Sequence, residues 1–513
     1  MEIKNIKNYA IVIFPLISFF YIFFFNHYQY QDILAGDFLF YTHTNHQFNT
    51  VVNTITPGLD SMNIAFNYFP IYVVNVFIFK NLGVPIDILF KLNFAIFSLI
   101  NFLSARYLFR NNINKNTYSL IYALNPLTFF YFFYYNFWVN LVYCLLPITI
   151  KLVNKFFTDG SDRLIYIKLI ILFLFFNYGI TNPGYFISSL IFINILSLKH
   201  FTLCKKFFLK IITLNILIIL LTLKTTLIMF LALTELDTAV YLNQNKDFIS
   251  GHTVDYLSTA FFAEKNHFIF KHAYLYAFWI PLVFYFLKSF NSFNYYHFIY
   301  IIFFVLTTKL VLIINVEIIL DIFNNLILGT IRNYQKTNLF LPILFLMCIG
   351  KQNFKFIKYY FYLFLITGLL YSGVGEEHFI ETPKEYKELR EINFQNDQHN
   401  SMVAIFPIKY SSSTWERFEW GANGYNFISN YINAPFISYF YPYLEYKQKI
   451  NSLNILNIFD NFNINYVLFH KDKVIPFSES NEQLSIFEEG VVQGKFIKIK
   501  DNLYYDVYKV NYD

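Results

Sequence analysis

Apolar segments long enough to cross a lipid bilayer are the strongest constraint on this fold. About 30 Å of hydrocarbon is crossed by roughly 20 helical residues, and shorter runs remain candidates where charged residues flank them. Eleven runs in the first 374 residues meet these conditions: 9–26, 87–109, 118–135, 138–150, 164–180, 184–198, 208–233, 272–288, 296–316, 338–350 and 357–374. The sequence therefore predicts a polytopic α-helical membrane protein with about 11 transmembrane helices.

A twelfth apolar run, 66–79, decides the orientation of everything after it. If it lies at the membrane surface, the inner segments collect 17 Lys and Arg residues and the outer loops 6; if it spans, the numbers become 8 and 15. Positive charge accumulates on cytoplasmic loops, so the first topology is favoured. We therefore expect a cytoplasmic N-terminus, a retained first span, and a long external first loop at 27–86 with a juxtamembrane helix.

Charge divides the chain into two parts. Residues 1–374 hold 26 basic and 14 acidic side chains, whereas residues 375–513 hold 13 basic and 19 acidic ones. Since the basic excess of the first part is mostly an orientation signal on inner loops, the formal net charge of +6 does not indicate a nucleic-acid partner. With 56% hydrophobic and 14% charged residues, the chain is neither a disordered protein nor a soluble one.

The last segment, 375–513, is long enough for one extracytoplasmic soluble domain of α/β or α+β type. A buried strand is predicted for 401–407, a helix for 453–463 and a strand for 466–470. Trp415 and Trp420 flank two glutamates in a loop that ends in glycines. Aromatic faces beside carboxylates suit an acceptor sugar, and a packed structural loop is the alternative.

The external first loop contains the candidate catalytic carboxylate, Asp37. A carboxylate just outside a span, with its pKa raised near the bilayer, could deprotonate a sugar hydroxyl. The alternative is that Gly36-Asp37 is a helix N-cap. Possible supporting residues nearby are Asp32, His43 and His46; the two histidines could share a metal with Asp37 or be ordinary surface histidines.

Two later external loops supply further candidates. Glu235 and Asp237 leave a span directly and could face the same cleft as the first loop, or be solvated loop acids. Arg332 and Lys336 lie on the side of the membrane where positive charge is rare. One helical turn apart, they would present a fork and a point charge to a lipid phosphate; interfacial snorkelling is the alternative.

Five segments together resemble the GT-C superfamily of membrane glycosyltransferases, near its mycobacterial arabinofuranosyltransferase-like and YfhO-like branches. Gly36-Asp37 follows the first span, and Asn81-Leu-Gly-Val-Pro85 ends the juxtamembrane helix. The other three are similar to that branch's "alyalnP" span, "FRxPxKF" loop and "lgvkYvlv" segment: Tyr122-Ala-Leu-Asn-Pro126, Ile331-Arg-Asn-Tyr-Gln-Lys336 and Phe462-Asn-Ile-Asn-Tyr-Val-Leu468. This chain has no second acidic residue adjacent to Asp37, and Tyr334 stands where the loop motif has proline.

The resemblance implies transfer of a sugar from a polyprenyl-phosphate donor to an extracytoplasmic glycan, lipid or protein acceptor. Asp37 would be the base, and Arg332 and Lys336 would bind the donor phosphate. Whether a divalent cation takes part is left open. The alternatives are a non-enzymatic exporter of lipid-linked sugars or other polar solutes, with Lys224 and Lys309 along its path, and an O-antigen-polymerase-like enzyme.

Overall fold

The computed structural model divides the chain into two compact units. Unit 1 comprises Met1–His27 and Phe90–Val374, and unit 2 comprises Tyr28–Leu89 and Gly375–Asp513. The structure describes residues 33–34, 82, 86–125, 127–128, 137–158, 163–179, 183–204, 206–222, 280–308, 334–350, 379–380, 383–392, 394, 402–407, 416–420, 423–424, 432, 436–437, 455–461, 464–474 and 477–512.

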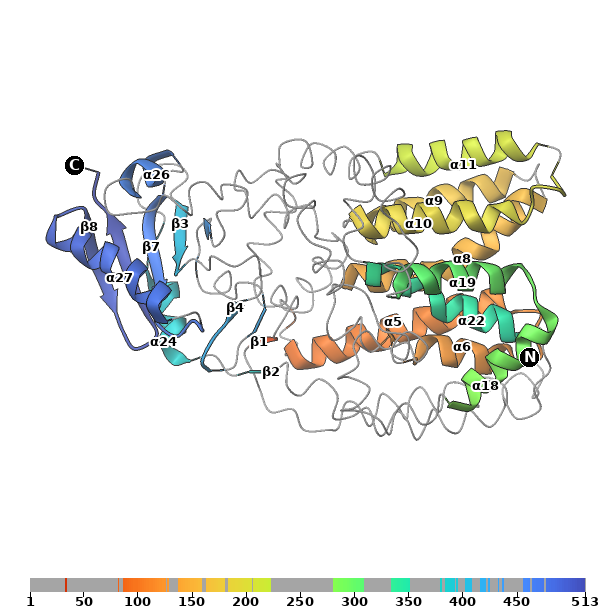
Figure 1. Cartoon of the computed structure of the whole chain (residues 1–513), viewed down its shortest axis with the longest axis horizontal. Helices are drawn as coiled ribbons and strands as arrows, with labels where there is room; N and C mark the ends of the chain where they lie inside the picture. Colours follow the sequence, from red (N-terminus) through yellow and green to blue (C-terminus); the bar gives the residue numbers. More distant parts are fainter. Residues whose placement is uncertain are drawn as a thin grey trace. The chain divides into compact units, whose positions relative to one another are not determined.

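Unit 1 is helical in its described part, and Figure 1 shows several of its helices running side by side. Helix α8 packs on α9 and α10, and α19 packs on α22. The helices are α5 (Ile86–Leu108), α6 (Lys115–Ala123), α8 (Phe137–Thr158), α9 (Arg163–Gly179), α10 (Pro183–Leu198), α11 (Phe207–Leu221), α18 (Ile280–Ser289), α19 (Tyr295–Thr307) and α22 (Leu341–Ile349), with the 3-10 helices η2 (Phe290–Ser292) and η4 (Tyr334–Phe340).

Except for α18, whose described part begins at Ile280, these helices start within three residues of the predicted apolar runs. Their ends differ more: α6, α11 and α19 end at Ala123, Leu221 and Thr307, before the predicted ends at 135, 233 and 316. Helix α8 continues to Thr158, eight residues past the predicted end of its run, and its last turns include the polar residues Asn154 and Lys155. Among the described residues, α8 contains the one stretch long and apolar enough to cross a membrane, Leu141–Thr158; the other apolar helices are shorter in their described parts.

The polar side chains of unit 1 point inward and many apolar ones outward. On α5, Ser98, Asn101 and Ser104 are buried, whereas Leu99 and Leu103 are exposed. Between α10 and α11, the Asn194 and Asn215 side chains exchange two hydrogen bonds of 2.9 and 2.8 Å. Polar contacts between helices with apolar side chains outside are typical of helices packed in lipid, where water does not drive burial. The described helices therefore favour a membrane environment.

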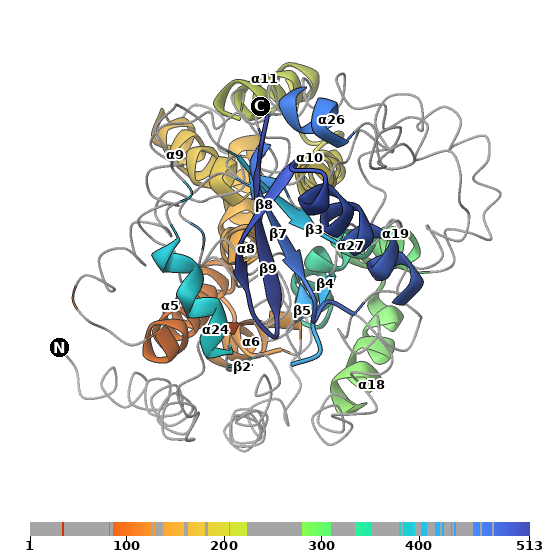
Figure 2. The same cartoon turned by 90° about the vertical axis from the view of Figure 1, so that its left-hand side faces the viewer.

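The second unit contains a five-stranded mixed sheet in the order β6-β3-β7-β9-β8. Strand β3 runs parallel to β6 and β7, and β9 is antiparallel to both β7 and β8. Figure 2 shows the sheet with α27 beside it. The bounds are β3 (Met402–Phe406), β6 (Phe436–Ile437), β7 (Ile464–His470), β8 (Phe496–Asp501), β9 (Tyr505–Val510), α26 (Ile455–Asn461) and α27 (Phe477–Val492).

Strand β7 lies in the middle of the sheet and contributes side chains to the cores on both faces. Val467 and Phe469 pack in the core shared with α26 and α27. Tyr466 and Leu468, which alternate with them, pack in the opposite core with Tyr386 and Leu389. As predicted, β3 lies within 401–407 and α26 within 453–463, and β7 begins two residues before the predicted strand 466–470. Strands β8 and β9 and helix α27 follow in a stretch where no helix or strand was predicted.

Gly490 allows α27 to approach β8 closely. A Cβ added there would lie 2.3 Å from Cδ2 and 2.6 Å from Cε2 of Phe496, whose ring is buried against Phe487. We expect Gly490→Ala to reduce the stability of the sheet by about 1–3 kcal/mol through overpacking. Hydrogen exchange of the β8 and β9 amides in the full chain measures this loss.

The exposed neighbour Glu489 provides the control, since Glu489→Ala adds no atom to the core and should change stability by less than about 0.5 kcal/mol. Phe496→Leu in the Gly490→Ala background should recover part of the loss. Equal protection in Gly490→Ala and Glu489→Ala would contradict the close approach.

Candidate functional site

Most of the predicted site residues lie outside the described residues. These are Asp32, Asp37, His43, His46, Glu235, Asp237, Arg332 and Trp415, together with Lys224 and Lys309 of the predicted spans. Lys336 falls within η4, and Trp420 is described with its side chain. Among the described residues there is no group of three His, Cys, Asp or Glu side chains suited to a metal ion. The roles of these residues remain predictions.

The 3-10 helix η4, which contains Lys336, is held in place by two sets of side-chain contacts. Phe340 of η4 lies 4.5 Å from Phe192 of α10 and 5.0 Å from Phe303 of α19 between ring centroids. One turn away along η4 and α19, the Thr337 and Thr307 hydroxyls are 2.7 Å apart. The aromatic layer and the hydroxyl pair join η4 to its neighbouring helices, so the chain after Lys336 has a defined backbone path.

The Tyr122-Ala-Leu-Asn-Pro126 motif forms a buried polar network. The Tyr122 hydroxyl donates to the Tyr143 carbonyl at 2.6 Å, and their rings stack with centroids 4.4 Å apart. The Asn125 amide nitrogen lies 2.7 Å from the Tyr122 carbonyl and 2.6 Å from the Tyr143 hydroxyl. Thr128 closes the network through its backbone N–H to Asn125 Oδ1 at 3.2 Å. The motif therefore joins the end of α6 to α8 and is structural in this chain.

A short antiparallel pairing connects the first loop to the start of the C-terminal segment. Strand β1 (Ile33–Leu34) pairs with β2 (Phe379–Ile380), with Ile33 opposite Ile380 and Leu34 opposite Phe379. Asp32 immediately precedes β1, and Asp37 follows three residues after its end. The chain next to the candidate base is thus paired with the C-terminal segment within unit 2.

The C-terminal sheet carries a buried cluster of titratable side chains at the end of β7. The Tyr386 hydroxyl, from α24 (Lys384–Lys387), lies 2.7 Å from His470 Nδ1 and 2.8 Å from Asp472 Oδ1. Trp420 donates its indole N–H to Asp472 Oδ2 at 2.6 Å. A hydroxyl has one proton, so when Tyr386 donates to Asp472 its oxygen accepts from His470 Nδ1–H. The four side chains form one hydrogen-bonded chain, which we call the Asp472 cluster.

Burial shifts the pKa of both ionisable groups in the Asp472 cluster toward the neutral form. It raises the pKa of Asp472 to about 6, although the hydrogen bonds from Tyr386 and Trp420 act in the opposite direction. Burial also lowers the pKa of His470 well below its usual value, and the nearby Lys473 adds to this effect. This cluster was not predicted; the run His470-Lys-Asp472-Lys at the end of a predicted strand was the available signal in the sequence.

Trp420, a predicted acceptor-binding residue, belongs to this cluster. It is half-buried and packs on the core of Tyr386 and Phe418, with ring centroids 6.0 and 5.7 Å away. Its loop is tied to the sheet by the Glu419 N–H, which donates to the Asp472 carbonyl at 2.9 Å. The indole N–H is therefore engaged within the protein, and its partly exposed surface is the part left for a ligand.

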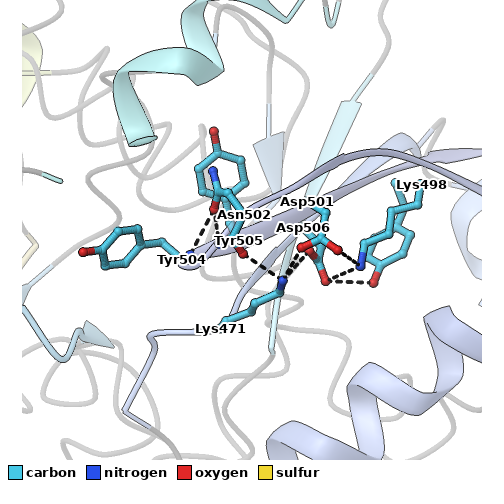
Figure 3. A network of polar contacts seen from close by, with 8 residues as sticks. Lys471, Lys498, Asp501, Asn502, Tyr504, Tyr505 and Asp506 are labelled. Atoms are coloured by element: carbon cyan, nitrogen blue, oxygen red, sulfur yellow. Dashed lines mark hydrogen bonds and ion pairs between the residues drawn. The ribbon is translucent and has the colours of Figure 1, made fainter. Parts of the chain in front are cut away.

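The hairpin of β8 and β9 carries a second polar network, drawn in Figure 3. Lys471 Nζ lies 2.7 Å from both Asp501 and Asp506, and Lys498 Nζ lies 2.9 and 3.0 Å from the same two carboxylates. The hydrogen bonds from the two lysines hold the pKa of Asp501 well below its usual range. Because the charges satisfy one another, this network fixes the hairpin to the end of β7.

No family model matches the sequence, and no curated protein matches it. Solved structures match the fold. The cryo-EM structure of arabinofuranosyltransferase AftD from Mycobacteria aligns with a TM-score of 0.61 over 98% of this chain and 40% of that chain, at 10% identity. The two chains share a fold. A mutant form of AftD aligns with a TM-score of 0.56 over 98% of this chain and 42% of that chain, also at 10% identity.

The alignment spans nearly all of this chain and less than half of AftD, so it concerns one part of that enzyme. The crystal structure of the Archaeoglobus fulgidus oligosaccharyltransferase aligns with a TM-score of 0.42 at 9% identity, over 90% of this chain and 68% of that chain.

Proposed function

We propose that this chain is a membrane glycosyltransferase of the GT-C type that uses a polyprenyl-phosphate-linked sugar as donor. The observation that carries the proposal is the fold shared with arabinofuranosyltransferase AftD over 98% of the chain. The acceptor would be a glycan, lipid or protein on the extracytoplasmic side. The excess of Lys and Arg on the predicted inner loops supports an external first loop and C-terminal segment.

The proposed reaction is displacement at the anomeric carbon of the donor sugar. Asp37 takes the proton of the acceptor hydroxyl, whose oxygen forms the new bond to the anomeric carbon. The bond from that carbon to the phosphate oxygen breaks, and the polyprenyl phosphate leaves with the electron pair. Arg332 and Lys336 stabilise its charge, because cations at the membrane interface can meet a phosphate that the lipid keeps there.

A deletion strain tests the function directly. If the proposal holds, its envelope glycans or glycoproteins lack one sugar, and membranes containing the full chain transfer that sugar from a radiolabelled polyprenyl-phosphate donor. An exporter would instead leave the lipid-linked sugar trapped on the inner leaflet of the deletion strain, with no transfer by purified protein. That second pattern would overturn the proposal.

Arg332→Ala separates phosphate binding from the proton transfer. The substitution removes a bidentate donor to the phosphate, and hydrogen bonds to charged groups contribute about 1.5–3 kcal/mol. We therefore expect the KM for the polyprenyl-phosphate donor to rise about 10- to 100-fold, measured by initial rates in detergent.

Arg110, predicted on an inner loop, supplies a matched control, since Arg110→Ala removes the same charge on the opposite side of the membrane. Its donor KM should stay within about twofold of wild type. Equal donor KM values for the two variants would remove Arg332 from the donor site.

A further inference from the structure

The β1–β2 pair connects the part of the first loop next to Asp37 with the chain that leads into α24. Strand β1 ends at Leu34, three residues before Asp37, so at about 3.3–3.6 Å per residue Asp37 is tethered within roughly 10 Å of the pair. Its partner β2 ends at Ile380, four residues before α24 begins. Residues 28–89 and the C-terminal segment 375–513 also belong to the same compact unit, unit 2.

The segment that follows β2 is bound firmly to the C-terminal sheet. Tyr386 and Leu389 are fully buried in the core on one face of the sheet. The Tyr386 hydroxyl is held by His470 and Asp472, and the Tyr505 hydroxyl donates to the Glu385 carbonyl at 2.7 Å.

An ion pair continues this attachment past α24. Lys500 Nζ of β8 lies 2.7 Å from Glu388 Oε2 of η8 (Glu388–Glu391). It is partly exposed and contributes little by itself. Buried side chains, hydrogen bonds and the ion pair together bind α24 and η8 to β7, β8 and β9.

A two-stranded ribbon of two residues per strand is not stable on its own in water. The position of the ribbon therefore depends on the segments that continue from its strands. Strand β2 continues into α24. From these connections we infer that the C-terminal sheet positions the first loop: through α24 and β2 it holds β1, and thereby the chain that carries Asp37. This inference rests on the proposed function, in which Asp37 is the base.

A consequence for catalysis follows from the geometry of proton transfer. A general base works only within hydrogen-bond reach of the proton it takes, and displacement of a catalytic group by about 1 Å can reduce the rate about 100-fold. Loss of the connection to the C-terminal sheet would then lower kcat, in addition to any effect on the affinity for the acceptor. A purely acceptor-binding domain would change the acceptor KM alone.

Disulfide cross-linking tests the pairing without reference to activity. In a full-length chain whose native Cys144, Cys204 and Cys348 are replaced by alanine, Ile33→Cys with Ile380→Cys, and Leu34→Cys with Phe379→Cys, place cysteines at directly opposed positions. Opposed positions of an antiparallel pair lie about 4.5–5.5 Å apart between Cα atoms, within disulfide range. Oxidised membranes should yield the linked peptides by mass spectrometry.

The matched control is Ile33→Cys with Phe379→Cys, which are neighbouring rather than opposed positions, with side chains on opposite faces of the ribbon. It should give less than about one tenth of the linked peptide. Equal yields from the control and the opposed pairs, or no linked peptide from either opposed pair, would overturn the inference.

An inserted linker tests the positioning role. Gly-Ser-Gly-Ser placed between Thr382 and Pro383 keeps β1, β2 and the sheet intact but separates β2 from α24. We expect kcat to fall at least 10-fold with the donor KM within twofold. The same insertion after Gly494, a turn with open space around it, is the control and should leave kcat within twofold.

The two experiments distinguish failure of this inference from failure of the proposed function. If the wild-type chain transfers no sugar, the proposed function fails, while the cross-links still report whether β1 pairs with β2. If the wild type is active and both insertions have the same kcat, the function stands and the positioning role is wrong.

Discussion

Asp37→Asn is expected to abolish sugar transfer while the protein still accumulates and binds its donor. The substitution keeps the size and polarity of the side chain but removes its capacity to accept a proton. General base catalysis contributes about 10²- to 10⁴-fold, so kcat should fall by that factor at neutral pH. The donor KM should be unchanged, because the proposed phosphate-binding residues are Arg332 and Lys336. Transfer from a radiolabelled polyprenyl-phosphate sugar, with protein quantified by immunoblot, measures both.

Asp60→Asn is the matched control, since it removes a carboxylate further along the same predicted external loop. It should retain kcat within about twofold. Wild-type transfer by Asp37→Asn would rule out the catalytic role, and an equal loss in both variants would indicate a general requirement for charge in the loop. The catalysed rate should also rise with pH through the pKa of Asp37 in the wild type and lose that dependence in the variant.

The helical part of the fold was predictable because lipid imposes a simple requirement on sequence. Each crossing needs an uninterrupted apolar run, and the helices α9, α10 and α19 begin within one residue of their predicted runs. The end of α8 was not predictable by this rule, since Lys155 and Thr158 continue the helix after its apolar run ends. Helical hydrogen bonding does not stop where hydropathy changes.

In the C-terminal sheet, the predictable strands were the central ones. Residues of β3 and β7 are apolar almost without interruption because both faces of these strands are covered. The edge strand β8 instead alternates apolar residues with Lys498 and Lys500, and its neighbour β9 carries Asp506. Their charges are satisfied across the hairpin, a long-range relation that no local pattern contains.

The Asp472 cluster was missed for the same reason. Tyr386, Trp420 and His470 are separated by tens of residues, and their contacts arise only when α24 and the Trp420 loop pack on the end of β7. In the sequence, Trp420 was one of two tryptophans beside acidic residues, and the sugar-binding interpretation was equally open to both. The structure adds the partner of the Trp420 indole, which is Asp472.

The Asp472 cluster should give the C-terminal sheet two opposing pH dependences. The pKa of Asp472 is raised to about 6 from 3.8, so the folded sheet takes up this proton before the unfolded chain does. Lowering the pH from 7 to 4 therefore stabilises the sheet through Asp472, by at most about 3 kcal/mol at 1.36 kcal/mol per pH unit. His470 acts in the opposite direction: its pKa is lowered on folding, so stability falls as the pH drops below 6.5.

Removing either Asp472 or His470 should change how the stability of the sheet depends on pH. We expect Asp472→Asn to lose stability relative to wild type as the pH falls from 7 to 4.5, since only the wild type is stabilised by protonation of Asp472 in the folded sheet. His470→Asn should gain stability relative to wild type over the same range, since only the wild type is destabilised by protonation of His470 in the unfolded chain. The difference for Asp472→Asn should reach about 2 kcal/mol at pH 4.5, and the difference for His470→Asn should have the opposite sign. Hydrogen exchange of the β7 amides in the full chain, corrected for intrinsic rates, measures the opening free energy at each pH.

The comparison with wild type at each pH cancels the titration of carboxylates elsewhere in the chain. The groups that face Asp472 are Tyr386 from α24, His470 and Lys473 at the end of β7, and Glu419 and Trp420 from the preceding loop. Lys473 stays in place in both variants, where it donates to the Pro407 carbonyl at 2.9 Å. Differences from wild type of the same sign in the two variants would contradict opposite pKa shifts of Asp472 and His470 on folding.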